Sequence, residues 1–318
     1  MNSFWDKLKK PFTVLAPMDG VTDVVFRQII TEIGKPDVLF TEFTPCAGLL
    51  STAKARVEES LLFNQDERPI VAQIWGHIPD QFLKTAKDLR TKGFDGIDIN
   101  MGCPIRTIIR DGACSGLIKN PDLAVEIIRA TKKGAGGLPV SVKTRLGYNE
   151  INIDWIKVLL RQELSALTIH LRTVAELSKA KPHWERVSEI ISLRNKIAPK
   201  TLIIVNGNIR TIAEVYKKYK KYGCDGFMIG SGVFANPWVF NEKVDMEKIS
   251  VIQRIDLYLH HIDLFEKQWD GKKNFAPLKK FAKIYISNFE SASDLREKLM
   301  ESKSIEDLKS ILLSRRKY

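Results

Sequence analysis

The chain has 318 residues, 44% hydrophobic and 28% charged, so it is long enough to bury the core of one large domain and a smaller one. Its 50 Lys and Arg outnumber its 38 Asp and Glu, and the resulting net charge of +12 favours a polyanionic partner. The four cysteines form no Cys-x-x-Cys pair, which argues against a zinc site or a disulfide framework, and the absence of a signal-peptide or membrane-length apolar run predicts a cytoplasmic protein without a membrane partner.

Eight short, β-rich apolar runs recur along the first three quarters of the chain, and most are followed by an amphipathic stretch. The predicted strands span residues 12–18, 37–43, 69–76, 96–102, 139–147, 166–172, 201–207 and 226–232. The predicted helices between them span residues 22–34, 80–92, 121–134, 153–163, 184–197 and 211–223. This number of strand–helix units in about 240 residues predicts a (β/α)₈ barrel.

The fourth predicted strand ends at a cysteine. Ile97 and Ile99 alternate with polar residues, and Gly102 and Pro104 then end the strand on either side of Cys103. A thiol is thereby placed at the carboxyl end of a barrel strand, where barrel enzymes hold their chemistry. The alternative is that Cys103 is a small buried core residue.

The other predicted strands also end in polar or small residues, and a barrel brings all strand ends to one face. These residues are Pro17, Met18, Glu42, Gln73, Asn100, Lys143, Arg145, His170, Arg172, Asn206 and the Gly230-Ser231-Gly232 turn. The set lacks the His, Asp and Glu spacing of a metal centre, so we expect no metal.

Such a face suits a flat, polar, anionic ligand. Gln73 offers a donor and an acceptor to a heterocycle, and Lys143 favours negative charge on it. Gly207 and Gly230, at the seventh and eighth strands, occupy the usual phosphate position of barrel enzymes. Together these residues predict flavin mononucleotide (FMN), although each taken alone also has a purely structural explanation.

The last part of the chain is predicted to be helical. From about residue 245 there is no strand run, and the stretch 276–289 shows helical periodicity. Its apolar stripe is Leu278, Phe281, Ala282, Tyr285 and Phe289, with Lys279, Lys280 and Lys283 beside it. Residues 267–283 hold six Lys and one acid, which makes a candidate face for a nucleic-acid backbone; a merely solvated helix surface is the alternative.

Six stretches carry a resemblance to the tRNA-dihydrouridine synthase family over nearly the whole chain. They are residues 16–23 (APMDGVTD), 98–104 (DINMGCP), 143–147 (KTRLG), 206–208 (NGN), 228–230 (MIG) and 236–238 (NPW). The resemblance implies an FMN-binding catalytic barrel at residues 1–242 and a small all-α, tRNA-binding domain at residues 243–318.

The resemblance also implies the reaction, which is reduction of the C5–C6 bond of uridines in tRNA. Reduced FMN supplies a hydride to C6, Cys103 supplies a proton to C5, and NADPH or NADH acts as the transient reductant. A thiol with an ordinary pKa of about 8.5 is mostly protonated at neutral pH and suits this role. We expect a monomer, while the oligomeric state and the modified uridine stay open.

The residues of the site follow by position in the resemblance. Those implied for the flavin ring and its polar edge are Pro17, Met18, Asp19, Gln73, Lys143 and His170, and those implied for its phosphate are Asn206, Gly207, Asn208, Gly230 and Ser231. Asn100 and Arg145 are implied for the uracil, Arg172 for phosphate or substrate, and Lys279, Lys280 and Lys283 are expected to contact the RNA backbone.

Three positions depart from the family pattern. Leu171 replaces a glycine, Asn208 replaces an aspartate, and Ser231 replaces an arginine. Loss of the guanidinium at position 231 removes a charged phosphate contact worth roughly 1.5 to 3 kcal/mol. Asn208 can offset part of this loss of flavin affinity, because it removes a negative charge near the phosphate. Ser231 motivates one alternative, a non-catalytic RNA-binding homologue with weak flavin binding. A second alternative is a barrel flavoenzyme acting on a free pyrimidine.

Overall fold

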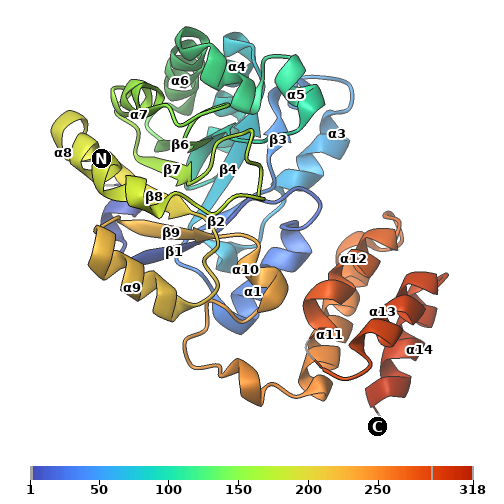
Figure 1. Ribbon diagram of the computed structural model, residues 1–318. Coiled ribbons are helices and arrows are strands. Elements are labelled where there is room, and N and C mark those ends of the chain that lie inside the picture. Colours follow the sequence, from blue (N-terminus) through green and yellow to red (C-terminus); the bar gives the residue numbers. More distant parts are fainter. Residues whose placement is uncertain (1–2, 288, 317–318) are drawn as a thin grey trace. The chain divides into compact units, whose positions relative to one another are not determined.

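A computed structural model describes residues 3–287 and 289–316, and it confirms the predicted barrel (Figure 1). All eight predicted strands are present. They are β1 (Phe12–Leu15), β2 (Leu39–Phe40), β4 (Ile70–Trp75), β5 (Gly96–Met101), β6 (Val140–Arg145), β7 (Ala166–His170), β8 (Leu202–Asn206) and β9 (Gly226–Ile229). A further two-residue strand, β3 (Thr44–Pro45), pairs with the end of β4 and was not predicted.

The strands form a closed parallel ring. Their order is β1-β9-β8-β7-β6-β5-β4-β2, and every pairing is parallel. A bridge between Val14 and Val38 joins the two ends of this order. The Leu15 amide donates to the Val38 carbonyl at 3.2 Å, and the Val38 amide donates to the Thr13 carbonyl at 3.2 Å. The ring therefore presents all strand carboxyl ends on one face.

The predicted helices follow their strands. They are α1 (Val24–Gly34), α4 (Pro79–Thr91), α6 (Pro121–Ala135), α7 (Ile153–Leu160), α8 (Val187–Ile197) and α9 (Ile212–Tyr222). The sequence signals for helix ends hold in α6, where the Asn120 side chain accepts from the Leu123 amide and Gly136 ends the helix in the left-handed region. Glycine also lets α6 approach α4, because a Cβ at Gly134 would lie 2.3 Å from the Leu83 carbonyl oxygen.

Short helices occupy several loops. They are α2 (Cys46–Leu49), α3 (Lys54–Val57), α5 (Arg106–Arg110), α10 (Gly232–Ala235) and the 3₁₀ turns η1 (Phe4–Lys7), η2 (Glu58–Leu61), η3 (Gln65–Glu67), η4 (Cys114–Lys119), η5 (Trp184–Arg186) and η6 (Met246–Lys248). Of these, η4 matters most for the site, since it follows the strand that carries Cys103.

An apolar cluster fills one part of the barrel. It includes Trp5 from η1, Phe12 and Val14 from β1, and Val71 and Ile204 from opposite parts of the ring, all buried. The Trp5 and Phe12 ring centroids are 5.8 Å apart. Because these side chains exclude water there, polar side chains of the barrel interior gather toward the strand carboxyl ends.

The chain consists of two compact units. The first comprises residues 1–24, 36–209 and 213–230, and the second comprises residues 25–35, 210–212 and 231–318. The helices of the second unit, besides most of α1, include α11 (Val251–Trp269), α12 (Ala276–Tyr285), α13 (Ala292–Glu301) and α14 (Ile305–Arg316). The helical character predicted after residue 245 is thus confirmed, whereas the domain boundary at residue 243 stays a prediction.

The second unit has an aromatic core. Phe26 lies 5.3 Å from Phe281 between ring centroids, and His261 lies 4.5 Å from Phe281. The predicted stripe of α12 is buried at Leu278, Phe281, Ala282 and Tyr285, but the helix ends at Tyr285, so Phe289 lies outside it. Asn288, which the prediction placed in the same helix, is outside the described residues.

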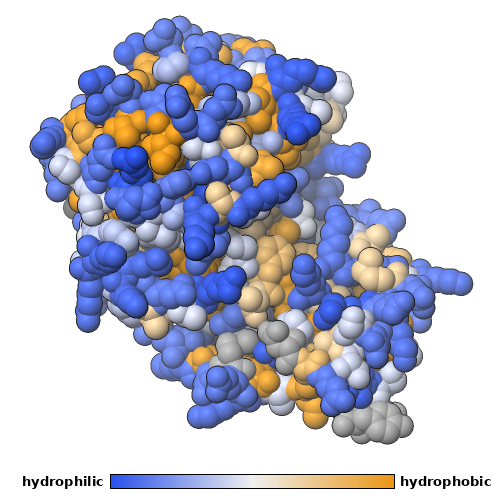
Figure 2. Space-filling model, viewed as in Figure 1, coloured by the Kyte–Doolittle hydropathy of each residue, from blue (hydrophilic) through white to orange (hydrophobic). Residues whose placement is uncertain are grey.

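Hydrophilic residues cover most of the face seen in Figure 2. Within the described ranges, no helix combines the length and apolar character needed to cross a membrane.

Asp225 ties three segments of the barrel together. Its carboxylate accepts from Arg194 of α8 at 3.0 Å and from the Ile203 amide of β8 at 2.8 Å. Lys10, just before β1, pairs with it at 2.6 Å. Asp225 is only 2% exposed, so these partners replace the water that its charge would otherwise bind.

We expect Asp225→Ala to lower the free energy of unfolding by about 3 to 5 kcal/mol, because it leaves the buried Arg194 guanidinium without its counter-charge. Urea unfolding followed by circular dichroism measures this change. The control is Asp80→Ala, which breaks an exposed ion pair with Lys84 and should cost less than about 1 kcal/mol. Equal effects of the two substitutions would contradict the role given to Asp225.

Candidate active site

A row of polar side chains crosses three neighbouring strands of the barrel. The strand register sets Gln73 of β4 beside Asp98 of β5, and Asp98 beside Ser141 of β6. Gln73 Nε2 donates to Asp98 Oδ2 at 2.7 Å, and Ser141 Oγ donates to Asp98 Oδ1 at 2.6 Å. Burial raises the pKa of Asp98 to about 6, against the lowering effect of these two donors. Asp98 thus fixes the predicted flavin ligand Gln73.

Asn100 connects this row to the cysteine loop. Its Nδ2 donates to Gln73 Oε1 at 2.9 Å, while its Oδ1 accepts from the backbone amides of Gly102 and Cys103, both at 3.0 Å. On the other side, Ser115 Oγ of η4 donates to the Cys103 carbonyl at 2.7 Å. The backbone of Cys103 is therefore held from β5 and from η4.

The environment of Cys103 favours its thiolate. The residue is 8% exposed, and its pKa is lowered to about 7, first by a hydrogen bond from the Cys114 thiol and further by the charges of Lys143 and Arg145, while burial opposes the shift. Burial raises the pKa of Cys114 well above its ordinary value, so Cys114 stays the donor. At pH 7 a larger fraction of Cys103 is thus deprotonated than its ordinary pKa predicts.

Lys143 lies between Asn100 and Thr168 in the strand register. Burial, followed by repulsion from Arg145, lowers its pKa to about 8, so it remains mostly charged at pH 7. Across residues 3–287 and 289–316, its ammonium group has no hydrogen-bond or ion-pair partner. The neighbouring Thr168 Oγ1 is also buried without a partner in that part of the chain. The half-buried Lys143 side chain is therefore available to a ligand, whereas Thr168 Oγ1 is fully enclosed.

Arg145 joins the loops that follow β5 and β7. Its Nε donates to the Gly102 carbonyl at 2.8 Å, and its Nη1 donates to the Thr173 and Leu177 carbonyls at 3.0 and 2.9 Å. The side chain is buried, and burial lowers its pKa to about 10, so it stays charged. The Nη2 group is the part of Arg145 left for the predicted uracil contact.

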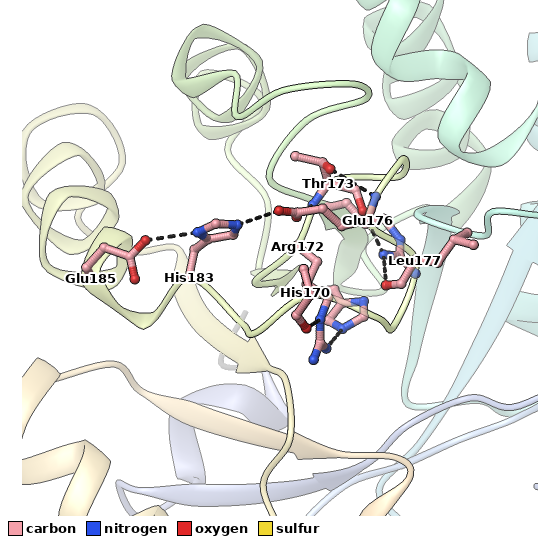
Figure 3. A network of polar contacts seen from close by, with 9 residues as sticks. His170, Arg172, Thr173, Glu176, Leu177, His183 and Glu185 are labelled. Carbon is pink, nitrogen blue, oxygen red and sulfur yellow. Dashed lines mark hydrogen bonds and ion pairs between the residues drawn. The ribbon is translucent and has the colours of Figure 1, made fainter.

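His170 and Arg172 meet at the end of β7 (Figure 3). Arg172 donates to the Ala180 carbonyl at 2.6 Å, to His170 Nε2 at 3.0 Å and to Asn208 Oδ1 at 3.1 Å. Burial, followed by repulsion from Arg145, Lys143 and Arg172, lowers the pKa of His170 to about 2, so its ring is neutral. Because a guanidinium only donates, His170 Nε2 accepts and its proton lies on Nδ1, which is free to donate to a ligand.

A second network fixes the loop after β7, and the sequence analysis did not predict it. Glu176 accepts from the Thr173 amide at 2.7 Å and pairs with His183 Nε2 at 2.7 Å. His183 Nδ1 pairs in turn with Glu185 at 2.9 Å (Figure 3). Glu176 is the main cause that raises the pKa of His183. This network of hydrogen bonds fixes the segment whose Thr173 and Leu177 carbonyls bind Arg145.

The predicted phosphate residues come from the ends of β8 and β9. Asn206 Nδ2 donates to the Met228 carbonyl at 2.8 Å. Gly207 and Asn208 adopt positive φ values of 155° and 51°, and a Cβ at Gly207 would lie 3.0 Å from Pro182. A Cβ at Gly230 would lie 3.3 Å from Ala16 Cβ. Side chains of Pro182 and Ala16 thus crowd the Cβ position of these two glycines, so a larger residue at either position would force a local shift.

The remaining predicted flavin residues lie nearer the surface of the protein. Met18 is half-buried and lies 3.6 Å from the position of a Gly230 Cβ, Pro17 is half-buried, and Asp19 is exposed. Ser231 is exposed and begins the second unit, so its place beside the other phosphate residues stays a prediction.

The three predicted RNA-binding lysines differ in their surroundings. Lys279 Nζ donates to the Met300 carbonyl at 3.0 Å and to the Ser302 carbonyl, so it caps the carboxyl end of α13. Lys280 and Lys283 are exposed and line a groove of about 430 Å³ between α12 and α13, together with Arg296. Only the latter two lysines have free charges for an RNA backbone.

The barrel mouth fits an anionic ring with carbonyl oxygens, as FMN has. Lys143, Arg145 and Arg172 bring three positive charges together; Asp98 acts on Lys143, and Glu176 acts on the two arginines. Lys143 Nζ, His170 Nδ1 and Arg145 Nη2 supply the free donors, while Gln73 keeps one N–H and one lone pair unused.

Solved structures with a similar fold are barrel proteins. An old yellow enzyme homologue from Zymomonas mobilis matches 74% of this chain and 90% of its own, with a TM-score of 0.50 and 14% identity. Histamine dehydrogenase from Rhizobium sp. 4-9 matches 79% of this chain and 48% of its own, with a TM-score of 0.52 and 12% identity. At such low identities the match concerns the fold alone.

Sequence comparison is more specific. The chain is 46% identical over 314 residues to a probable tRNA-dihydrouridine synthase of Staphylococcus aureus, covering 98% of this chain and 94% of the relative. It is 45% identical over 314 residues to probable tRNA-dihydrouridine synthase 2 of Bacillus subtilis, covering 98% and 95%. The dihydrouridine synthase (Dus) family model matches residues 14–316. With 46% identity over almost its whole length and the Asn100–Cys103 loop in place, the chain belongs to the dihydrouridine synthase family.

Proposed function

We propose that the protein reduces uridines in tRNA to 5,6-dihydrouridine, with FMN as cofactor and NADPH or NADH as reductant. The observation that carries the proposal is Cys103, whose backbone Asn100 and Ser115 hold and whose thiol feels the charge of Lys143, an ammonium with no hydrogen-bond or ion-pair partner among the described residues. The names of the relatives support tRNA as the substrate. The free donors around Lys143 and His170 support an anionic flavin.

The roles of the residues follow from their free groups. Gln73, Lys143 and His170 would hold the polar edge of the flavin, while Asn206, Gly207, Asn208, Gly230 and Ser231 would surround its phosphate. Pro17, Met18 and Asp19 would lie along the ring. Bound by these residues, reduced FMN would supply a hydride to C6 of the uracil. The charge of Lys143 would favour electron density on a flavin ring bound beside it.

Cys103 is the proton donor in this proposal. A pKa of about 7 places its thiol close to the operating pH, which suits a general acid that must give up a proton and recover it in each cycle. Arg145, through Nη2, and Asn100, through its remaining N–H, can bind the uracil oxygens and place C5 against the thiol. Arg172 is already bound to Asn208 and Ala180, so it positions the phosphate loop.

Substrate RNA requires a larger surface than a free base does. A uridine must leave its stack to enter a barrel mouth, and the RNA around it must be held meanwhile. We assign this task to the helical domain at residues 243–318, with Lys280 and Lys283 as exposed contacts and Lys279 as the residue that fixes α13 beside them.

Cys103→Ala should keep its bound flavin and its NADPH oxidation by dioxygen, but lose most dihydrouridine formation, by about 100-fold or more, because the proton donor is gone. The measurement is dihydrouridine in an unmodified tRNA transcript after incubation with FMN and NADPH. Cys103→Ser is the size-matched control, since its weaker acid should also react slowly. Full turnover by Cys103→Ala would refute the assignment, and reduction of free uridine by the wild type would favour the free-pyrimidine alternative.

The pH dependence provides a separate test. A general acid acts only when protonated, so the rate of tRNA reduction by pre-reduced enzyme should fall as pH rises through about 7. Cys114→Ala removes the hydrogen bond that stabilises the Cys103 thiolate, so it should raise the pKa of Cys103 and move this decline to higher pH. Cys224→Ala, another buried cysteine, is the control and should leave the midpoint unchanged. A midpoint that does not move in Cys114→Ala would count against the mechanism.

A further inference from the structure

The second unit contains a pocket of about 570 Å³ at the N-terminus of α11, and the proposed reaction uses none of its residues. Its wall comes from four segments of the chain: residues 210–211, residues 235–236, residues 247–254 and Phe289. Thr211, Ala235 and Ser250 at its edge are exposed, so the pocket is open to solvent.

Among the described residues, the side chain of Arg254 on this wall has no counter-charge. Arg254 is 5% exposed, and its Nη1 has no hydrogen-bond partner within the described ranges. Its guanidinium carbon lies 5.9 Å from the ring centroid of Trp238, which is a weak substitute for an anion. Burying a cation without a partner lowers the stability of the native state. An anion that binds beside Arg254 would remove this cost.

The end of α11 adds an independent attraction for an anion. The helix has 19 residues, and its N-cap Ser250 accepts from the Gln253 amide. By helix geometry the amides of Val251 and Ile252, one turn from Arg254, have no carbonyl partner inside the helix. Asn236 Oδ1 is bound to the Trp238 amide at 2.9 Å, which leaves its N–H₂ group as a donor.

The charges around the pocket favour an anion as well. Two arginines, Arg210 and Arg254, contribute to the wall, against one carboxylate, Glu247, which is exposed. Helix N-terminus, buried guanidinium and side-chain amide together match the donors that proteins use for phosphate oxygens. Because the pocket is open at its edge, a phosphate can enter while the molecule that carries it stays outside.

We propose that this pocket binds a backbone phosphate of the RNA substrate, with Arg254, the first amides of α11 and Asn236 as donors. This inference rests on the proposed function, which supplies the RNA. It adds a contact separate from the groove of Lys280 and Lys283, and one that fixes the position of a single phosphate instead of attracting the backbone in general.

The first experiment measures the affinity of an unmodified tRNA transcript as a function of salt for the wild type, Arg254→Met and Lys248→Met. Arg254→Met should weaken binding about tenfold and reduce the salt slope by about one counterion. Lys248→Met removes the same charge from an exposed side chain next to the pocket and should change affinity less than about twofold. Equal affinity and salt slope in Arg254→Met and the wild type would overturn the proposal.

Folding and kinetics separate this role from a structural one. Arg254→Met should keep the thermal unfolding temperature of the wild type or raise it, because methionine can fill the space against Trp238 without a buried charge. Its KM for tRNA should rise about tenfold with kcat unchanged, the pattern of lost uniform binding. A fall in kcat at unchanged KM would contradict a binding role.

Binding of inorganic phosphate shows whether the pocket takes a phosphate of the RNA or a small free anion. Phosphate at tens of millimolar should raise the unfolding temperature of the wild type but not of Arg254→Met, whether or not the protein acts on tRNA. If phosphate protects only the wild type while both proteins bind tRNA equally, the pocket takes a small free anion and the RNA assignment is wrong. Failure of the wild type to bind tRNA would overturn the proposed function, and this phosphate arm would still decide whether the pocket binds an anion.

Discussion

The position of Cys103 depends on the side-chain oxygen of Asn100. This oxygen accepts hydrogen bonds from the backbone amides of Gly102 and Cys103. That oxygen can accept both because the amide group of Asn100 is oriented by Gln73, and Gln73 is oriented by the buried carboxylate of Asp98. A chain of hydrogen bonds thus runs from the barrel interior to the thiol. Each member is deprived of water, so loss of one would leave the next unsatisfied.

Arg145 connects the cysteine loop to a second loop. A charged group that is buried and bound to three backbone carbonyls is a costly but rigid connector, and here it spans the loops after β5 and β7. The hydrogen bonds of Glu176 with Thr173 and His183 fix the loop after β7 as well. The proposed proton donor and the proposed substrate contacts are therefore parts of one framework instead of independent side chains.

Much of this arrangement could be predicted from the sequence, because apolar alternation locates strands and a barrel collects their ends on one face. Asp98 was missed as a site residue although it lies two residues from Asn100 and shares its inward direction. The contacts of Cys103 with Cys114 and Ser115 could not be predicted, since they depend on the path of an irregular loop. The same holds for the Glu176–His183 pair, and Phe289 shows that periodicity alone does not reveal where a helix ends.

The bridge between Val14 and Val38 has a consequence for aggregation. A closed ring has no free strand edge that a neighbouring chain can pair with. Here the closure between β1 and the segment just before β2 consists of one bridge, two backbone hydrogen bonds and the contacts of Thr13 with the Asp37 carboxylate, whereas β6 and β7 are in register over five residue pairs. Opening of the barrel at this seam therefore breaks fewer backbone pairings than opening between β6 and β7, and it would expose two adjacent edges of a sheet rich in β-branched residues. Closure of this seam thus removes the edges through which neighbouring chains could pair during folding.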